Sequence, residues 1–473
     1  MKFLDRIPEM QRLLALHNAE GGGLGLVWGR RRIGKTRLLV EWIRQAGGIY
    51  TVADQSAPAV QRRYFAEALS GALAGFSEPE YPDWRTLLRA LGRQAASIGW
   101  RGPLVLDELP YLAAASPELP ATLQTFVDHD ARQAGLWIVL AGSSQRMMQG
   151  LQLDRSSPLF GRATAAIELQ PLPAGFIGEA LGTADPVSSV RAWSAWGGIP
   201  RYWELAQRFG ANTDAAVDAL VLDPAGPLHL EPDRLLVEEL PSATALRPLL
   251  DAVGSGAHRV SEIAGRLGTS ATTLSRPLTR LQELGLLQRD KPFGELELGG
   301  KRSLYRIGDP FTRMWFRIVA PHRAALATGG PATRSALWKR YAARLTAHAW
   351  EDLCRAALPR LPGSAPGGSG PWGPALRYWK GDGPEWDLVA ASIEGDALLL
   401  GEAKWSDRPF TETMIEEAAR ALLSKGIPRE RWAHDKRVVH ALFVPRLASM
   451  RRKHSVGSIA EVFTAEHVLA ALR

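Results

Sequence analysis

The sequence predicts an α/β fold for the first third of the chain and a second block of strands and helices at its C-terminal end. Up to about Gln170, short apolar runs alternate with helical patterns, which is typical of a parallel sheet covered by helices. A mostly helical stretch follows from Ala174 to about Leu235, and mixed patterns return from about Ala347. The apolar runs that indicate the first sheet are residues 25–28, 104–106 and 136–141.

Length and composition limit the classes of protein to consider. A chain of 473 residues suggests about three domains, at roughly 100–200 residues each. Charged residues make up 22% and apolar residues 46%, as in ordinary globular proteins, so a fibrous or largely disordered chain is excluded. The formal net charge of +8 suits a nucleic-acid or other acidic partner, but it suits an ordinary solvated surface equally well.

Targeting and redox features point to one compartment. No apolar run approaches the ~18 residues that a membrane span needs, and charged residues such as Lys2 and Asp5 interrupt the start of the chain where a signal peptide would be apolar. The single cysteine, Cys354, excludes an intramolecular disulfide framework and a cysteine-cluster zinc site. We therefore expect a cytoplasmic protein with no membrane partner.

A glycine-rich segment, GRRRIGKT, follows the first apolar run and precedes the helical pattern TRLLVEWIRQ. It matches the phosphate-binding pattern G-x-x-x-x-G-K-[ST], in which backbone N–H groups and the positive end of the following helix face phosphate oxygens. Lys35 is expected to reach the β and γ phosphates of ATP, and the Thr36 hydroxyl to bind Mg2+. A glycine-rich turn can match this pattern by chance. The residues predicted to bind the nucleotide are Gly29, Arg30, Arg31, Arg32, Ile33, Gly34, Lys35, Thr36 and Arg37.

A second motif makes a chance match less plausible. Residues 104–108 read LVLDE, a buried strand that ends in two carboxylates. Asp107 is expected to hold the magnesium shell, and Glu108 to orient or deprotonate the attacking water. Such a pair is costly to bury without cations. A third strand, LWIVLAG, delivers Ser143 beside the expected γ-phosphate, where its hydroxyl is either a phosphate sensor or only a turn or helix cap.

These motifs resemble those of the archaeal-type ATPase family, a branch of the AAA+ and STAND group of P-loop NTPases. The resemblance implies ATP binding with slow or regulated hydrolysis. It also implies that Arg162 is a γ-phosphate or intersubunit sensor, and that GGIP is a lid segment near the base or phosphates. An intersubunit role would require a homo-oligomer, and the sequence leaves the oligomeric state open. The resemblance rests on GRRRIGKT (29–36), VLDELPYL (105–112), AGSSQRMM (141–148), SPLFGR (157–162), ELQPL (168–172) and GGIPRYW (197–203).

Residues 260–307 predict a winged helix. The segment VSEIAGRLGTSATTLSRPLTRLQELG gives a short helix, a turn and a longer helix starting near Ala271, and LLQRDKPFGELELGGKRSLYRI gives a β-like ribbon. A winged helix used only for protein packing is the alternative to DNA binding, and Pro277 could kink the second helix. If the segment binds duplex DNA, the expected contacts are Thr272, Thr273, Arg276 and Arg280 in the groove, and Lys301 and Arg302 on phosphates.

The last block carries a second set of carboxylates. PEWDLVAAS and ALLLGEAKW read as adjacent strands that place Asp387 on one strand and Glu402 and Lys404 on the next. Two such carboxylates can bind Mg2+, and the lysine can position the water that attacks a phosphodiester. A preceding helix with Glu351 could add a third acidic ligand. A salt-bridged β-hairpin would give the same three residue types.

This arrangement resembles the PD-(D/E)XK nuclease superfamily, in the form of the nuclease-like domain fused to archaeal-type ATPases. The resemblance implies an ATPase coupled to a winged helix and a nuclease-like domain, acting on or near DNA. Two alternatives stay open: an NTPase signalling switch or scaffold with an inactive C-terminal domain, and a transcription regulator. The predicted segments are a P-loop ATPase core over residues 1–172, a helical lid over 173–240, a winged helix over 241–310, a linker or packing segment over 311–345 and a restriction-endonuclease-like α/β domain over 346–473.

Overall fold

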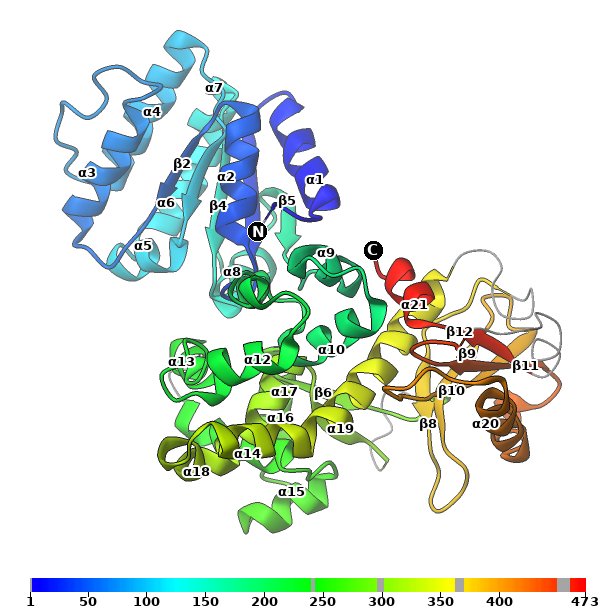
Figure 1. Ribbon diagram of the computed structural model, residues 1–473. Coiled ribbons are helices and arrows are strands. Elements are labelled where there is room, and N and C mark those ends of the chain that lie inside the picture. The colour runs from blue at the N-terminus through cyan, green and yellow to red at the C-terminus, as the bar shows by residue number, and fades with distance from the viewer. Residues whose placement is uncertain (1, 240–242, 296–301, 362–369, 449–459) are drawn as a thin grey trace. The chain divides into compact units, whose positions relative to one another are not determined.

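A computed structural model describes residues 2–239, 243–295, 302–361, 370–448 and 460–473 (Figure 1). The chain forms two compact units. The first unit comprises residues 2–172 together with residues 199–201, and the second comprises most of the remaining chain. Among the described residues, no helix combines the length and the apolar character that crossing a membrane requires.

The first unit is built on a five-stranded parallel sheet in the order β2-β3-β4-β1-β5, with helices on both sides (Figure 1). Strands β1, β3 and β4 are buried along their whole length, which explains their continuous apolar runs. The strands are β1 (Gly23–Trp28), β2 (Ile49–Val52), β3 (Leu104–Asp107), β4 (Trp137–Gly142) and β5 (Ala163–Glu168). The helices are α1 (Ile7–Asn18), α2 (Lys35–Ala46), α3 (Pro58–Leu69), α4 (Trp84–Ile98), α5 (Leu109–Ala115), α6 (Leu119–Phe126), α7 (Arg132–Ala134) and α8 (Gln145–Leu153).

Helices dominate the first part of the second unit, as the sequence predicts. The predicted linker or packing segment, 311–345, begins with an apolar cluster, since Phe311, Met314, Trp315 and Phe316 are all buried. Helix α19 runs unbroken through the boundary predicted at residues 345/346. The helices here are α9 (Ile177–Leu181), α10 (Pro186–Trp196), α11 (Pro200–Ala206), α12 (Thr213–Val217), α13 (Glu231–Glu239), α17 (Pro310–Ile318), α18 (Arg323–Thr328) and α19 (Pro331–Ala357).

Between them lie three helices and a two-stranded antiparallel ribbon: α14 (Ala243–Gly254), α15 (Val260–Leu267), α16 (Ser275–Glu283), β6 (Leu287–Asp290) and β7 (Leu304–Ile307). The helix expected from about Ala271 begins only at Ser275, because residues 271–274 form a turn. Thr272 and Thr273 therefore lie before α16. Pro277 is the third residue of α16, where its missing N–H leaves no bond unmade, so it does not kink the helix.

The ribbon packs on the C-terminal part of the same unit. The Phe293 ring lies 4.9 Å from the Trp432 ring between centroids, and the Phe293 amide donates to the carbonyl oxygen of Arg377 at 2.8 Å. Arg302 forms an ion pair with Glu295 at 3.7 Å, whereas Lys301 lies outside the described residues. The part of the ribbon that reaches Trp432 is thus a packing surface.

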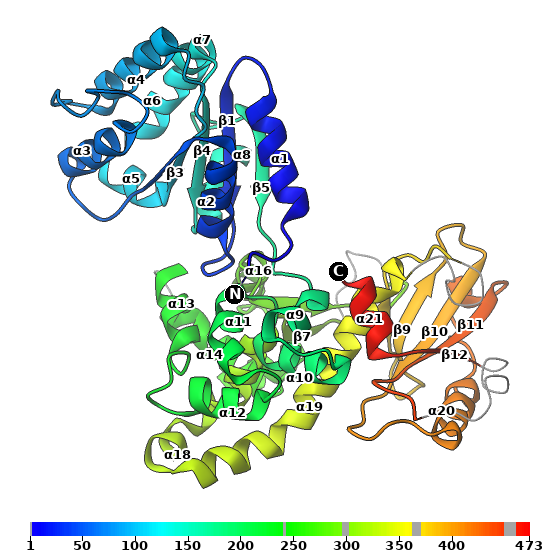
Figure 2. The same ribbon diagram turned by 45° about the horizontal axis from the view of Figure 1, so that its top comes forward.

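The C-terminal part is a five-stranded mixed sheet in the order β12-β11-β10-β9-β8, with α19 and α21 packed on one face and α20 on the other (Figure 2). Strands β9 and β10 are adjacent, as expected, and they pair antiparallel. The sheet and its helices are β8 (Leu376–Tyr378), β9 (Trp386–Ala391), β10 (Ala397–Ala403), α20 (Glu412–Ser424), β11 (Arg437–Phe443), β12 (Glu461–Phe463) and α21 (Ala465–Ala471).

Candidate functional site

The glycine-rich loop connects the buried strand β1 to helix α2, so its backbone turns over the carboxyl end of the sheet. Gly34, at the start of α2, has φ +95°, a conformation that a side chain would strain. Its loop neighbour Arg32 also has positive φ, at 66°. The loop therefore leads into the N-terminal end of α2, where the helix dipole is positive, which is the geometry of a phosphate site.

Lys35 is buried, and its ammonium lies over the loop. The Nζ atom donates to the carbonyl oxygen of Gly29 at 2.8 Å and to that of Arg30 at 3.3 Å. Ile33 is buried and fixes the underside of the loop, while Arg30, Arg31 and Arg32 are only partly buried. The charge of Lys35 is thus held where phosphate oxygens would replace carbonyl oxygens as its acceptors.

Asp107 is almost completely buried at the end of β3, yet its carboxylate is fully engaged. Oδ2 accepts hydrogen bonds from the Thr36 hydroxyl at 2.9 Å and from the Tyr50 hydroxyl at 2.7 Å. Oδ1 accepts from the backbone amide of Glu108 at 2.8 Å. The two residues predicted to bind Mg2+ are therefore in direct contact, and both present oxygen atoms, which that ion prefers.

Glu108 and Ser143 also meet. The backbone of Glu108 is left-handed, with φ 56°, which is uncommon for a residue with a side chain and often marks a functional position. Its carboxylate accepts a hydrogen bond from the Ser143 hydroxyl at 3.0 Å. Ser144, not Ser143, caps α8, so the helix-cap interpretation does not apply to Ser143.

Two further predictions of the resemblance can be located. Pro200 of GGIP lies beside the loop, since a Cβ placed on Gly34 would be 3.7 Å from its ring. Arg162 is bound elsewhere: its Nε donates to the Asp128 carboxylate at 2.9 Å, and its Nη1 donates to the carbonyl oxygen of Pro158 at 3.0 Å. As the side chain stands, Arg162 is held by the loop that carries it and by Asp128.

Three residues near the loop were not assigned a role from the sequence, and two of them, Tyr50 and Arg6, lie outside every motif. Tyr50 binds Asp107, and burial followed by that hydrogen bond raises the pKa of the phenol, so Tyr50 acts as a donor. Tyr111 accepts a hydrogen bond from Arg31 at 3.2 Å. The buried Arg6 donates to the carbonyl oxygen of Ile33 at 3.0 Å. Arg6 precedes the loop in the sequence and Tyr50 follows it, and both are too far away for a local pattern to reveal their contacts.

The C-terminal carboxylates come together on α19, β9 and β10. Burial, followed by the charge of Asp387, raises the pKa of Glu351 to about 7. Burial, followed by the charge of Glu402, raises the pKa of Asp387, whose Oδ2 accepts from the Ala403 amide at 3.1 Å. Each carboxylate is thus close enough to the next to oppose its ionisation.

Glu402 is held by two lysines. Its Oε1 pairs with Lys404 Nζ at 3.1 Å, and its Oε2 binds Lys425 at the end of α20. Burial alone would raise the pKa of Glu402, but these ammonium groups outweigh burial and lower it. Within the described ranges, no group of three or more His, Cys, Asp or Glu side chains is placed to hold a metal ion. Lys425 was not anticipated from the sequence.

Glu351 gives a prediction for the pH dependence of stability. The folded chain retains a proton on Glu351 that the unfolded chain releases between pH 4.5 and about 7, so the free energy of unfolding falls as pH rises through that window. From pH 5 to pH 8, deprotonation of Glu351 should lower the free energy of unfolding by roughly 2–3 kcal/mol. Glu351→Gln should abolish that loss. Urea denaturation of both proteins at the two pH values, with a chelator present, measures it.

His348 makes the opposite contribution to the pH dependence of stability. Burial, followed by the charge of Arg313, lowers its pKa from 6.5 to about 4, which makes stability rise with pH between those values. This opposite contribution is common to both proteins, so it cancels in their difference. If the parent and Glu351→Gln curves stay parallel from pH 5 to pH 8, Glu351 is not the group that titrates.

Comparisons with known proteins agree with the geometry of the first site. Residues 3–205 match a family described as an ATPase domain predominantly from Archaea. Residues 315–420 match a family of archaeal and bacterial proteins of unknown function. An uncharacterized protein of Methanocaldococcus jannaschii is 26% identical over 328 residues, which cover 69% of this chain and 71% of that protein.

The fold has a counterpart among solved structures. A Walker-type ATPase of Pyrococcus abyssi superposes with a TM-score of 0.52 and 20% identity, over 67% of this chain and 96% of that one. At this identity the similarity concerns the fold, and it agrees with the parallel sheet and the loop at the end of β1. Residues 3–205 are thus similar in sequence to an archaeal-type ATPase domain, and they have the fold of a P-loop ATPase core.

Proposed function

We propose that the first unit binds ATP with Mg2+ and hydrolyses it. One observation carries the proposal: a chain of hydrogen bonds links Thr36 to Asp107 and Ser143 to Glu108 across the carboxyl ends of β1, β3 and β4. In open α/β sheets ligands bind at this edge of the sheet. The ammonium of Lys35, the metal-binding oxygens of Thr36 and Asp107, and the carboxylate of Glu108 would serve ATP hydrolysis at this edge.

The roles follow from the positions. Lys35 exchanges the carbonyl oxygens of Gly29 and Arg30 for phosphate oxygens, while Thr36 and Asp107 would hold Mg2+. When bound, that ion would neutralise charge on the β and γ phosphates. Glu108 orients or deprotonates the attacking water, and Ser143 fixes its carboxylate. Arg37, Gly34 and the other loop residues complete the binding segment.

Lys35→Ala tests nucleotide binding. Losing one charged partner of a buried contact costs about 2–5 kcal/mol, so the affinity for ATP should fall by roughly 30-fold or more. Equilibrium binding of radiolabelled ATP with Mg2+ measures it. Arg44→Ala is the matched control, because Arg44 lies on the same helix and its side chain is 72% exposed. Unchanged affinity in Lys35→Ala would refute the proposed site.

We further propose that residues 243–307 form a winged helix and that α16 binds duplex DNA. Arg276 is exposed on the first turn of α16, and Thr272 and Thr273 are exposed just before it. Arg280 lies on the same helix, in an ion pair with Glu283 at 3.1 Å. The packing of Phe293 on Trp432 supports the opposing view, in which the ribbon serves as a protein contact.

The salt dependence of DNA affinity distinguishes DNA binding by α16 from a role in protein packing alone. If α16 binds DNA, the logarithm of the affinity should fall linearly with the logarithm of salt concentration, and Arg276→Ala should reduce that slope by about one. Fluorescence anisotropy with a labelled duplex at several salt concentrations measures this. Arg12→Ala, an exposed change of equal charge on α1, should leave the slope unaltered. An absence of duplex binding would favour packing alone.

For the C-terminal part, two functions compete. The approach of Glu351, Asp387 and Glu402 beside Lys404 supports a nuclease-like domain that uses Mg2+ to cleave DNA. The capture of Glu402 by both Lys404 and Lys425 supports the alternative, a switch or scaffold in which this domain binds without cutting. Cleavage of DNA by the intact chain distinguishes them.

A further inference from the structure

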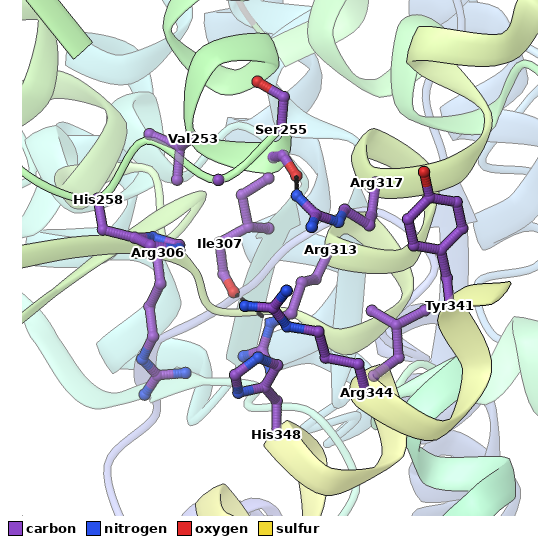
Figure 3. Close-up of a pocket in the computed structure, with 13 residues that line it drawn as sticks. Val253, Ser255, His258, Arg306, Ile307, Arg313, Arg317, Tyr341, Arg344 and His348 are labelled. Atoms are coloured by element: carbon purple, nitrogen blue, oxygen red, sulfur yellow. Dashed lines mark hydrogen bonds between the residues drawn. The ribbon is translucent and has the colours of Figure 1, made fainter. Parts of the chain in front are cut away.

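A basic cavity of about 260 Å³ lies in the second unit, bordered by α14, β7, α17 and α19 (Figure 3). Four arginines and two histidines line it, and none of its described lining residues is acidic: the arginines are Arg306, Arg313, Arg317 and Arg344, and the histidines His258 and His348. No motif in the sequence singled these residues out, because they come from four separate elements. The cavity is distinct from the loop of the first unit.

Two of the arginines form a fixed wall. Arg306 pairs with Asp290 at 2.7 Å and with Asp352 at 2.9 Å, and Arg313 pairs with the same Asp352 at 2.8 Å. Arg355 also binds Asp352, at 2.6 Å. These ion pairs, together with that of Arg355 and Glu351 at 3.7 Å, hold Arg306 and Arg313 in place at the side of the cavity.

Neither of the other two arginines forms an ion pair with a carboxylate among the described residues. Arg317 donates to the carbonyl oxygen of Gly254 at 3.3 Å, and its guanidinium lies 5.6 Å from the centroid of the Tyr341 ring. Arg344 makes no hydrogen bond or ion pair within the part of the chain that the structure describes. Figure 3 shows Arg344 and His348 extending from α19 toward Arg313. Burial, followed by the charge of Arg344, lowers the pKa of Arg317, which reflects this crowding of like charges.

We propose that the cavity binds a phosphate-bearing ligand through Arg317 and Arg344. Guanidinium groups bind phosphate oxygens in pairs, and a phosphomonoester carries a charge of about −1.5 to −2 at neutral pH. Two arginines that have no acidic partner in the described ranges match such a dianion, whereas a carboxylate would leave one charge unbalanced. Ligand pockets commonly measure about 300–1,000 Å³, so this one admits a phosphate with a small attached group.

The neighbouring space suggests where that ligand extends. A second cavity of about 100 Å³ shares His258, Arg306, Arg313 and His348 with the first and is lined also by Glu351. Asp290 and Asp352 line that cavity as well, so the group attached to the phosphate, and not the phosphate itself, would extend toward these carboxylates. The source of the phosphate is either a free mononucleotide-sized phosphoester or the terminal phosphate of a nucleic-acid strand. The proposal depends neither on ATP hydrolysis nor on DNA cleavage.

The test uses the full chain carrying Lys35→Ala, so that phosphate binding at the loop of the first unit is not counted. Calorimetric titrations at low salt use inorganic phosphate, adenosine 5′-monophosphate, and a short single-stranded oligonucleotide with or without a 5′-phosphate. We expect saturable binding of at least one phosphate-bearing probe. Arg344→Ala and Arg317→Gln should each weaken it at least tenfold. Preference for the 5′-phosphorylated over the 5′-hydroxyl strand identifies a strand end, and binding of the monophosphate alone identifies a small phosphoester.

Lys339→Ala is the matched control, because it removes one positive charge from the exposed side of the same helix without touching the cavity. It should change the affinity less than twofold. Arg344 is exposed at the edge of the cavity, so Arg344→Ala is expected to fold even if Arg317→Gln does not. Failure of every probe to bind, or equal weakening by Lys339→Ala and Arg344→Ala, would overturn the proposal.

Discussion

Replacing Glu108 by glutamine is expected to lower the rate of ATP turnover by about 100-fold to 10,000-fold while ATP binding is retained. That range is the usual contribution of a positioned acid or base to catalysis. Glutamine keeps the shape of the side chain and can still accept the hydrogen bond from Ser143, but it cannot take a proton from water. Single-turnover hydrolysis and equilibrium ATP binding, measured on the same preparation, separate the chemical step from binding.

Two further variants test whether the loss of turnover is specific to the Glu108 carboxylate. Glu118→Gln makes the same chemical change at an exposed residue of the same unit and should leave turnover unaltered. Ser143→Ala frees the Glu108 carboxylate without removing it, so a smaller loss of turnover is expected than for Glu108→Gln. Turnover by Glu108→Gln at the rate of the parent chain would exclude Glu108 as the base.

The parts of the fold that were predictable are those with strong local signals. The runs in β1, β3 and β4 are continuous because these strands are buried on both faces of the sheet. β5, by contrast, reads ATAAIE and is mostly half-exposed, so it lacks an apolar run. The loop before α2 could be located because its glycines and lysine occupy fixed positions within a segment of eight residues, 29–36.

The candidate sites were predictable only where function leaves a contiguous motif. Tyr50 reaches Asp107 across 57 residues, and Lys425 reaches Glu402 across 23, so neither contact has a local pattern. The start of α16 was placed too early because the Ser and Thr residues before it form a turn, which such side chains favour, rather than a helix. Arg317 and Arg344 become neighbours only when α17 packs on α19.

The second large effect concerns the C-terminal carboxylates. If this domain cleaves DNA, Asp387→Ala and Lys404→Ala should each reduce magnesium-dependent nicking of plasmid DNA by at least about 100-fold, since each removes a group from the reacting centre. Glu394→Ala removes an equal charge from the exposed β9–β10 turn and should leave nicking unchanged. The assay needs the full chain with Mg2+ or Mn2+, with and without ATP.

Replacement of Lys425 helps to distinguish a nuclease from a domain that binds without cutting. In the present arrangement Lys404 and Lys425 both bind Glu402, so two ammonium groups occupy the carboxylate that a metal ion would need. Lys425→Ala should therefore lower the Mg2+ concentration required for half-maximal nicking if the domain is a nuclease, because one competitor for Glu402 is gone. Lys404→Ala should instead abolish nicking at every Mg2+ concentration. If neither the parent chain nor Lys425→Ala cuts DNA with either metal, the three carboxylates belong to a binding domain, and the ATPase acts as a switch.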